Sequence, residues 1–508
     1  MRTKYHQITL KDTFSDCQDL FREDTPSFFQ LLNDTLDISE FIPPDFYRAF
    51  YLALGRKRTY PLEGFLSALI LQKIFSIPTD SLLILFLGLC RELRDFCGFS
   101  KVPDAPLFSR FRTSFEPYIE QMFHKLVDLT EPICHLIDSS LANVLTFDTS
   151  GIELYVTENN PKTLNSLIKR LKAFYRDNPD VDPYRMAYAL MPSRAASCPD
   201  AKQQYINGHF CYADKFAVLT NGLGIIRHIT FLDDDFKKAH PEMTVDKKSD
   251  SPDEDKSIGD SSSLHPVLSD YFSLHPRFSP DTFLGDSAFD TIETYGFLKE
   301  EFHFSKALIP YNVRNESSLP EVGYNLYGYP TCPNDPSLAM KHLGHCHEKG
   351  RADREKWGCP KVHMVKGQYV CSCDNPCSTA KKGRTAYTYE NMDFRRFPGV
   401  QRDSEEWDAL YKIRTIVERA INHLKTNMCV AGRKSRHHVA TKADVVLAGI
   451  AGQLTVIVAH RLSYPQYIRS LKPLIAWNNI ACSENSPGLI KIRPKSDDLC
   501  QFRNNSED

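Results

Sequence analysis

The stretch ANVLTFDTSGIELYV, residues 142–156, marks the point where the sequence pattern changes from helical to extended. The apolar and β-branched residues of VLTF predict a buried strand, and Asp148 follows it directly. Thr149, Ser150 and Gly151 then predict a turn before a second extended run. A carboxylate is therefore expected at the end of a buried strand.

A β-hairpin is predicted downstream of this strand. The runs FCYADKFAVLT, residues 210–220, and LGIIRHITFL, residues 223–232, have strand-like composition, and Asn221-Gly222 separates them. Asn-Gly favours a tight hairpin turn because both residues tolerate positive φ. The two runs are expected to belong to the same sheet as the first strand.

A β-α-β unit is predicted further along the chain. TFLG, residues 282–285, is an apolar strand that ends on Asp286. The segment from about Thr291 to Phe302 has a helical pattern, and KALIP, residues 306–310, is a second strand. A second carboxylate is thus expected where a strand stops.

Residues 1–140 are predicted to be helical, and Pro61 and Thr79 are typical helix starts. Basic residues around the predicted turns leave two interpretations open, contact with a phosphate backbone or an ordinary solvated surface. These residues are Arg91, Arg94, Lys101, Arg110 and Arg112. Residues 442–462 are apolar on most faces, but glycines and Gln453 interrupt them, which favours a buried core helix over a membrane span.

The composition narrows the class of protein. A chain of 508 residues is expected to form several domains, and a net charge of -2 neither requires nor forbids a nucleic-acid partner. The N-terminus lacks an apolar run of signal-peptide length, so a cytoplasmic protein without a membrane partner is expected. The sequence contains no phosphate-binding Gly-x4-Gly-Lys loop, His-Glu-x2-His helix or dinucleotide-binding glycine motif, which argues against a nucleotide cofactor, zinc-protease chemistry and redox chemistry.

A stripe of polar residues lies on the predicted helix YKIRTIVERAINHLK, residues 411–425. Tyr411, Arg414, Glu418 and Lys425 are three, four and seven positions apart, which places them near one helix face. One interpretation is a solvated face with an Arg414–Glu418 ion pair. The other is a functional stripe, and the remaining acids favour it.

Three carboxylates are candidates for one catalytic site. Asp148 and Asp286 follow strands, and Glu418 lies on a helix that is able to pack across the sheet. Two Mg²⁺ ions that catalyse phosphoryl transfer require several hard oxygen ligands on rigid elements. Arg414 and Lys425 are candidates to hold DNA phosphates, and Tyr411 to bond a phosphate or stack on a base.

Other acids near these positions have competing interpretations. Asp233-Asp234-Asp235, after the predicted hairpin, is a rival to Asp286 as a metal ligand, although acidic turns are usually solvated. Glu153 and Asp290 are near the proposed triad in sequence. A supporting role, or no role, is expected for them.

These motifs together resemble a known family. Tyr411-x2-Arg414-x3-Glu418-x6-Lys425 resembles the Tyr-Arg-Glu-Lys signature of bacterial insertion-sequence transposases with an Asp-Asp-Glu triad. Further segments are similar to the other motifs of this family: FDTSGI at 147–152, GDSAFD at 285–290, GRTAYTYE at 383–390 with the segment 394–425, and, for the end-binding region, LRDFCGFSKVPDAPLFSRFR at 93–112. The resemblance extends over most of residues 45–460.

The resemblance implies an α/β fold, with an RNase H-like mixed sheet, a helical N-terminal domain and a Cys/His-rich insertion. It also implies a bacterial DNA transposase that is associated with the nucleoid and acts as a homodimer on double-stranded DNA. Such an enzyme binds the terminal inverted repeats of an insertion sequence, cleaves at the element ends and joins the 3′-OH ends to target DNA. Asp148, Asp286 and Glu418 are then the catalytic ligands of two Mg²⁺ ions, for which Mn²⁺ is able to substitute. Two alternatives remain open: a catalytically silent DNA-binding regulator descended from a transposase, and a nuclease that does not join strands.

A basic patch follows the predicted catalytic helix. GRKSRHH, residues 432–438, contributes Arg433, Lys434 and Arg436 and is expected to face DNA. Aromatic and basic residues of the preceding insertion, Trp357, Tyr369, Tyr387, Tyr389 and the run 381–384, leave DNA contact and ordinary packing equally open.

Cysteines and histidines cluster between the second and third acids. A structural Zn²⁺ site is one interpretation of this cluster, because Zn²⁺ binds four such ligands in a tetrahedron. The alternative is a set of reduced cysteines that only pack, because Cys-x2-Cys pairs are missing. The candidate ligands are Cys359, His363, Cys371, Cys373 and Cys377.

The sequence thus predicts five segments. They are a DNA-end-binding helical domain at 1–140, the first part of the catalytic core at 141–310 with a flexible linker at 240–264, the Cys/His-rich insertion at 311–402, the C-terminal part of the core at 403–462, and a loosely structured tail at 463–508.

Overall fold

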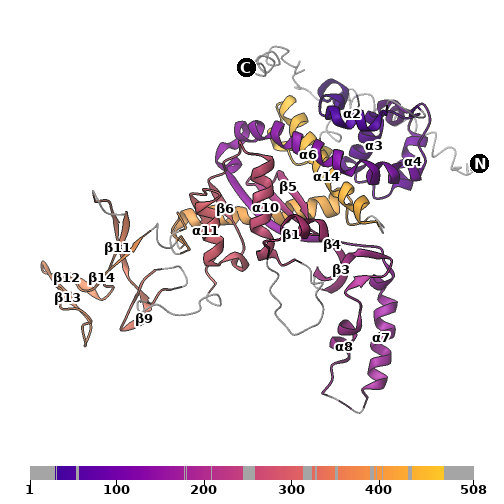
Figure 1. The fold of residues 1–508 in the computed structure, drawn as a ribbon. Coiled ribbons are helices and arrows are strands. Elements are labelled where there is room, and N and C mark those ends of the chain that lie inside the picture. Colours follow the sequence, from indigo (N-terminus) through magenta and orange to yellow (C-terminus); the bar gives the residue numbers. More distant parts are fainter. Residues whose placement is uncertain are drawn as a thin grey trace, which may run out of the picture. The chain divides into compact units, whose positions relative to one another are not determined.

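The chain divides into two compact units in the computed structural model (Figure 1). The helical unit comprises Met1–Ile133, Leu424–Lys434 and Val439–Asp508, and the sheet unit comprises Cys134–His423 and Ser435–His438. The structure describes residues 29, 31–52, 57–176, 178, 180–206, 209–243, 258–312, 323–325, 329–348, 353–389, 394–395, 398–402, 404–432 and 437–473. Residues 244–257 of the predicted linker and 474–508 of the predicted tail lie outside this description.

The helical unit is formed by helices whose starts follow local sequence signals. Pro61 precedes α3 and Thr79 caps α4 by accepting a hydrogen bond from the Leu82 N–H, as predicted. The helices are η1 (Ile38–Glu40), α2 (Pro44–Phe50), α3 (Leu62–Ile74), α4 (Asp80–Leu89), α5 (Arg91–Phe96), α6 (Ala105–Ala142, in this unit as far as Ile133), α14 (His438–Arg461, in this unit from Val439) and η7 (Pro465–Tyr467).

A buried ion network links four of these helices. Lys73 of α3 pairs with Asp444 of α14 at 2.6 Å, and Arg112 of α6 donates to both carboxylate oxygens of Asp80 on α4 at 2.9 Å. The Arg112 Nε also lies 3.4 Å from Asp444. We call Lys73, Asp80, Arg112 and Asp444 the ion network.

Arg112 is therefore not a surface residue, and both sequence interpretations of it were wrong. Its side chain is 0% exposed. A buried guanidinium is costly unless it has polar partners, and Asp80, Asp444 and Gln72 are its partners. Arg91, by contrast, is exposed and pairs with Asp95.

Helix α14 is long and apolar enough by composition to cross a membrane, and most of it is buried within the protein. The Thr130 hydroxyl of α6 donates to the Gln453 side chain at 2.6 Å, so the polar residue that interrupts the apolar run has a buried partner. The prediction of a core helix is confirmed.

Seven strands within the described residues form one mixed sheet in the sheet unit. Its order is β2-β3-β4-β1-β6-β7, with β5 paired to β4. The strands are β1 (Val144–Glu153), β2 (Arg194–Ala195), β3 (Cys198–Ile206), β4 (His209–Asn221), β5 (Ile226–Phe231), β6 (Thr282–Leu284) and β7 (Lys306–Leu308). β1 is antiparallel to β4 and parallel to β6, which in turn is parallel to β7.

Strand β1 continues through the segment predicted to turn. The long antiparallel partner β4 pairs in unbroken register from Leu145 to Glu153, so the polar residues after Phe147 keep their ladder hydrogen bonds. Asp148 lies within the strand and not at its end, and the turn prediction for residues 149–151 was wrong. Gly151 allows a close approach, because a Cβ there would overlap the side chain of Ile206.

The predicted hairpin and β-α-β unit are confirmed in type, with small differences in their bounds. β4 and β5 are antiparallel, but the connection runs from Gly222 to Ile225, longer than a two-residue turn, with Gly224 at φ +78°. Strands β6 and β7 flank α11 (Ile292–Glu300).

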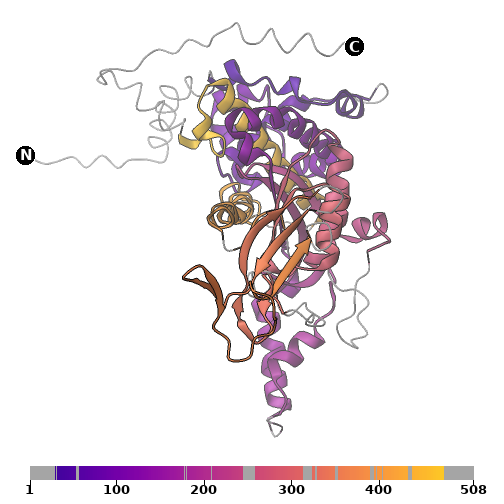
Figure 2. The ribbon, with the colours of Figure 1, turned by 90° about the vertical axis from the view of Figure 1, so that its left-hand side faces the viewer.

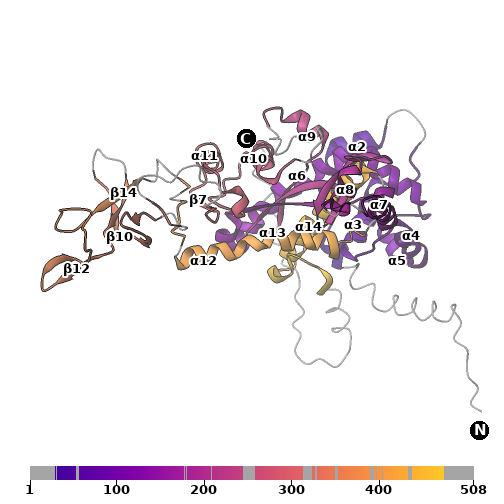
Figure 3. The same ribbon diagram turned by 90° about the horizontal axis from the view of Figure 1, so that it is seen from below.

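Helices cover both faces of this sheet (Figure 3). Leu145 and Phe147 of β1 join a core with α10 and α11, whereas Val144 joins a core with Leu284, Trp407 and residues of the next helical segment. Besides α11, the sheet unit contains the helices η2 (Thr157–Asn159), α7 (Pro161–Phe174), α8 (Pro183–Leu190), α9 (Asp234–Ala239), α10 (Asp260–Leu274), η3 (Ser287–Phe289), α12 (Glu405–Tyr411), η5 (Lys412–Thr415) and α13 (Ile416–Asn422). A π-helical turn (His423–Asn427) follows α13 and belongs to the helical unit from Leu424.

Helix α10 corrects the predicted linker. It begins at Asp260, so residues 260–264 are helical and Leu264 is fully buried. The acidic, Ser-rich composition concealed this start, because the apolar residues that bury the helix come only after three serines.

The insertion between β7 and α12 is built from short antiparallel strands, drawn in orange in Figure 2. β10, β11 and β14 form one sheet, and β12–β13 and β8–β9 form two hairpins. The strands are β8 (Thr331–Cys332), β9 (Asp335–Ala339), β10 (Lys341–Cys346), β11 (Arg354–Gly358), β12 (Val362–Val365), β13 (Gln368–Cys371) and β14 (Thr385–Tyr389).

Candidate active site

Asp148 lies within β1, and Asp286 lies two residues after the end of the neighbouring parallel strand β6, where it caps η3. The register pairs Thr146 of β1 with Leu284 of β6, and each acid stands two residues beyond that pair. Side chains alternate between sheet faces, so Asp148 shares the face of Val144, and Asp286 continues the alternation of Leu284. Both acids therefore belong to the face that α12 and α13 cover.

Glu418 lies on the helical segment that covers this face. Ser404 caps α12 by accepting from the Trp407 N–H, and the chain continues through η5 into α13 without leaving helical geometry. Ile416 and Val417 are buried, while the Glu418 side chain is 47% exposed. The structure thus places Asp148, Asp286 and Glu418 on the same side of the sheet.

Burial and the neighbouring charges change the pKa of Asp148. Burial is the main cause that raises the pKa of Asp148 to about 6, and the charges of Glu418 and Asp260 raise it further. The Thr149 N–H, which donates to the Asp148 carboxylate at 2.8 Å, and the charge of Arg414 act in the opposite direction. Like charges close to this half-buried carboxylate make its ionised form costly when no cation is bound.

Arg414 and Tyr411 lie among these acids. Arg414 pairs with Glu418 at 2.8 Å, and its guanidinium lies 5.8 Å from the centre of the Tyr411 ring. Burial, with the charges of Asp286 and Glu418, raises the pKa of Tyr411 to about 12, against the effect of Arg414. The Tyr411 hydroxyl is therefore a hydrogen-bond donor at neutral pH.

Asp260 is a fourth acid, which the sequence analysis assigned to a linker. It accepts a hydrogen bond from the Thr149 hydroxyl at 2.6 Å and pairs with Lys215 of β4 at 2.6 Å. Gly259 before it and the serines after it are a helix-start signal that could have identified it. Thr149 alternates with Asp148 along β1, so Asp260 lies at the sheet face that α10 covers, whereas Asp148, Asp286 and Glu418 lie at the other face. We call Asp148, Asp286 and Glu418 the acid cluster.

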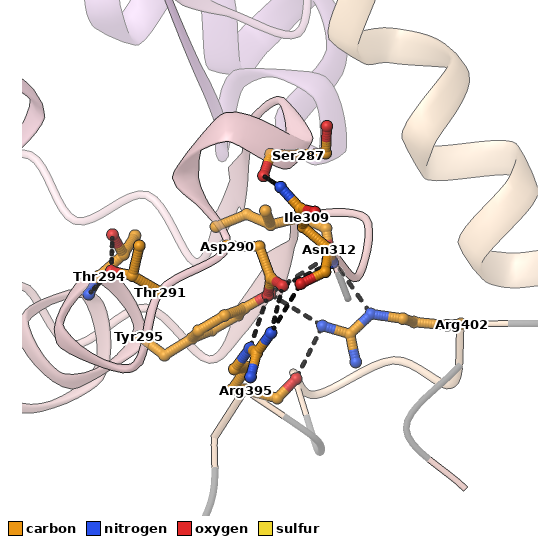
Figure 4. Close-up of polar contacts among 9 residues, drawn as sticks. All are labelled: Ser287, Asp290, Thr291, Thr294, Tyr295, Ile309, Asn312, Arg395 and Arg402. Atoms are coloured by element: carbon orange, nitrogen blue, oxygen red, sulfur yellow. Dashed lines mark hydrogen bonds and ion pairs between the residues drawn. The ribbon is translucent and has the colours of Figure 1, made fainter. Parts of the chain in front are cut away.

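A buried network fixes the loop that carries Asp286 (Figure 4). Asp290 is 0% exposed and accepts two hydrogen bonds from Arg395, at 3.0 and 2.7 Å, and one from the Asn312 N–H at 2.6 Å. Tyr295 donates to Asp290 at 3.0 Å and accepts from Arg402 at 2.8 Å. Asp290 thus holds the segment Asp286–Asp290 against the chain that leads into α12.

Asp233, Asp234 and Asp235 have structural partners. Asp233 caps α9 and lies 2.9 Å from His438, Asp234 pairs with Arg194 and Lys202, and Asp235 pairs with Lys238. These partners account for the three acids without a metal ion.

The other residues predicted to contact DNA lie in different parts of the chain. Lys425 lies in the π-helical turn that follows α13. Arg433, Lys434 and Arg436 lie outside the described residues. Trp357 is buried and its indole N–H donates to Thr388, so it packs in the insertion.

The candidate zinc ligands are partly dispersed. Burial, a hydrogen bond with Cys371 and the charge of Cys371 raise the pKa of the Cys373 thiol. Cys359 is buried and Cys377 is exposed, and His363 pairs in the β12–β13 register with Val370. Over the described ranges, no group of three or more His, Cys, Asp or Glu side chains is arranged to hold a metal ion, and this applies to the acid cluster as well.

Comparison with known proteins points to the same class of function. A family model described as "Transposase domain (DUF772)" matches residues 15–114, about a fifth of the chain. No curated protein matches the chain. The matched segment lies in the helical unit, and it supports a transposase, a DNA-processing enzyme encoded by a mobile element.

Proposed function

We propose that the protein is a DNA transposase of the Asp-Asp-Glu type with an RNase H-like core. In this proposal it binds the inverted repeats of an insertion sequence, cleaves at their ends and joins the 3′-OH ends to target DNA. The observation that carries the proposal is the common sheet face of Asp148, Asp286 and Glu418, with the raised pKa of Asp148. The mixed sheet, in which β1 is antiparallel to β4 and parallel to β6, supports the RNase H-like assignment.

The two units have separate roles in this proposal. The transposase-domain match at residues 15–114 supports end recognition by the helical unit. The acid cluster supports chemistry in the sheet unit. Two copies, one at each end of the element, would bring both ends to one target.

The chemistry of the acid cluster suits a hard divalent cation. Carboxylate oxygens are the ligands that Mg²⁺ and Mn²⁺ prefer, and a cation would relieve the repulsion that contributes to the raised pKa of Asp148. Asp148, Asp286 and Glu418 would hold the ions, and Glu418 would have to leave Arg414 to do so. When bound, two such ions activate the attacking oxygen and neutralise the charge on the leaving oxygen.

Arg414 and Tyr411 would then bind the DNA strand that is cut. Release of Glu418 frees a planar guanidinium, which binds phosphate oxygens in a bidentate manner. The Tyr411 hydroxyl keeps its proton at neutral pH and donates to a phosphate oxygen. Lys425 and the patch Arg433, Lys434 and Arg436 would contact phosphates further from the cut.

The test is an assay of the purified full-length protein on DNA that carries the ends of its own element, with Mg²⁺ or Mn²⁺. Cleavage at the ends, followed by joining of the 3′-OH ends to a plasmid, is the expected result. Binding without cleavage would instead support a silent regulator. Cleavage without joining would support a nuclease.

A further inference from the structure

Helices α7 and α8 pack against each other as a helical hairpin between β1 and β2 (Figure 1). We call residues 161–190 the basic hairpin. One face of α7 is apolar and packs against α8, which buries the two helices against each other. The residues of this contact are Leu164, Leu167, Ile168, Leu171, Tyr175, Met186 and Ala187.

The opposite face of α7 is positively charged. Lys162 and Lys169 are seven residues apart, so they lie on one face about 10 Å apart along the axis, and Arg170 is beside Lys169. Each stands one or two positions from an inward-facing leucine, which turns its side chain away from α8, and all three are exposed. Neither α7 nor α8 contains an acidic residue.

These charges have no internal function within the part of the chain that the structure describes. Lys162, Lys169 and Arg170 form no ion pair with a described side chain, whereas Lys172 donates to the Tyr184 hydroxyl at 3.0 Å and its Nζ lies 4.6 Å from the Tyr184 ring centre. Asp177, Asp180 and Asp182 lie in the connection between α7 and α8, so the positive charge is concentrated on the exposed face of α7 and not on the whole hairpin. Such a face attracts a polyanion.

The base of the basic hairpin is anchored to the strand that carries Asp148. The Asn159 side chain donates to the carbonyls of Leu154 and Tyr212, at 2.7 and 2.8 Å, and accepts from the Tyr212 N–H at 2.7 Å. β1 therefore runs from Asp148 into a fixed root, and α7 follows within two residues.

We infer that the exposed face of α7, formed by Lys162, Lys169 and Arg170, is a binding surface for the phosphate backbone of duplex DNA. The inference deepens the proposed function and rests on it for the identity of the polyanion. The contacts are to phosphates, so they position the duplex and do not read its sequence. Together they add to affinity in a way that depends strongly on salt.

The test measures binding of the full-length protein to a fluorescent duplex of arbitrary sequence, in EDTA, over a series of salt concentrations. Each phosphate contact contributes about 0.9 to the slope of log K against log salt, so K162Q/K169Q/R170Q should reduce the slope by about 2.7. The conservative variant K162R/K169R/R170K should keep the wild-type slope. The matched control K237Q/K238Q/R277Q removes the same charge at exposed positions on α9 and after α10, and it should also keep the slope.

An unchanged slope in K162Q/K169Q/R170Q would overturn the inference, and so would an equal fall in the control, because net charge alone would then explain the result. Circular dichroism checks that each variant is folded. If K162Q/K169Q/R170Q keeps the wild-type slope and still cleaves the element ends, the DNA-binding role of α7 is contradicted and the proposed function is not. If the slope falls in this variant but the wild-type protein cleaves no DNA, the DNA-binding role of α7 is supported and the proposed function is contradicted.

Discussion

The ion network of the helical unit and the acid cluster of the sheet unit are both built from charged side chains, but only the first is balanced. In the ion network, two cations, Lys73 and Arg112, meet two carboxylates, Asp80 and Asp444, at distances from 2.6 to 3.4 Å. Three of the four side chains are at most 2% exposed. Every charge has an internal partner, so the network requires nothing from outside.

The acid cluster has an excess of negative charge. Its three carboxylates share the region with Arg414, which pairs with Glu418, whereas Asp260 across the sheet has its own partner in Lys215. Burial is the main cause of the raised pKa of Asp148, and repulsion by Glu418 raises it further. A charge cluster therefore indicates function when its internal charges do not cancel, because folding alone gains nothing from the surplus charge.

The largest expected effect is on DNA cleavage. Asp148→Asn, Asp286→Asn and Glu418→Gln should each lower the cleavage rate by about a thousandfold or more, because each removes a charged ligand worth several kcal/mol in the transition state. Gel assays with pre-bound DNA measure the rate, and DNA affinity should be largely unchanged. Asp408→Asn, an exposed acid on α12, is the control. Full activity in any triad variant would exclude that residue from the site.

Breaking the ion network should affect stability and not chemistry. Asp444→Asn leaves Lys73 buried without its counter-charge and should lower the free energy of unfolding by about 3–5 kcal/mol. Asp95→Asn, which removes an exposed pair with Arg91, should cost less than about 1 kcal/mol. Denaturant titration measures both. Equal effects of the two substitutions would contradict the distinction between a buried network and a surface pair.

Removing the charge of Asp148 should stabilise the protein in a pH-dependent way. The folded protein holds this proton up to a pKa of about 6, whereas the unfolded chain releases it near pH 4, so ionisation costs the folded state about 3 kcal/mol. The cost is absent below about pH 4 and complete above about pH 6. Asp148→Asn should match the wild type at pH 4 and exceed it at pH 7 without divalent cations. A constant difference across this range would show that repulsion and burial do not act on Asp148.

The smallest effect on cleavage is expected from a substitution in the hydrogen-bond network around Asp290, which fixes the loop that carries Asp286. Tyr295→Phe removes one hydrogen bond to Asp290 and one from Arg402. Loss of such a supporting contact should raise the Mg²⁺ concentration needed for half-maximal cleavage by about tenfold. A lower maximal rate with an unchanged Mg²⁺ requirement would mean that Asp290 does not position a cation ligand.

The sequence predicted the main sheet elements because their signals are local. The apolar run before Asp148, the Asn221-Gly222 pair and the β-α-β pattern each depend on neighbouring residues, and each appears in the structure. The length of β1 was not predictable in this way. Its polar half is held by β4, whose pairing with residues 145–153 is a long-range contact.

The candidate site was predictable in its three acids but not in their surroundings. Asp148, Asp286 and Glu418 belong to recognisable motifs, and the structure brings them to one sheet face. Asp260 lies in an acidic, Ser-rich segment that resembles a linker, and two partners of Asp290, Asn312 and Arg395, are 22 and 105 positions away from it. Such partners become visible only when the chain is folded.

The central claim is that the surplus carboxylates form a divalent-cation site. Crystals of the protein soaked in Mn²⁺ test it directly, because anomalous scattering locates the ion. We expect a peak within about 2–2.5 Å of carboxylate oxygens of Asp148 and Asp286, with Glu418 turned from Arg414 towards the ion. Mn²⁺ bound only at other residues, with the Arg414–Glu418 pair intact, would contradict it.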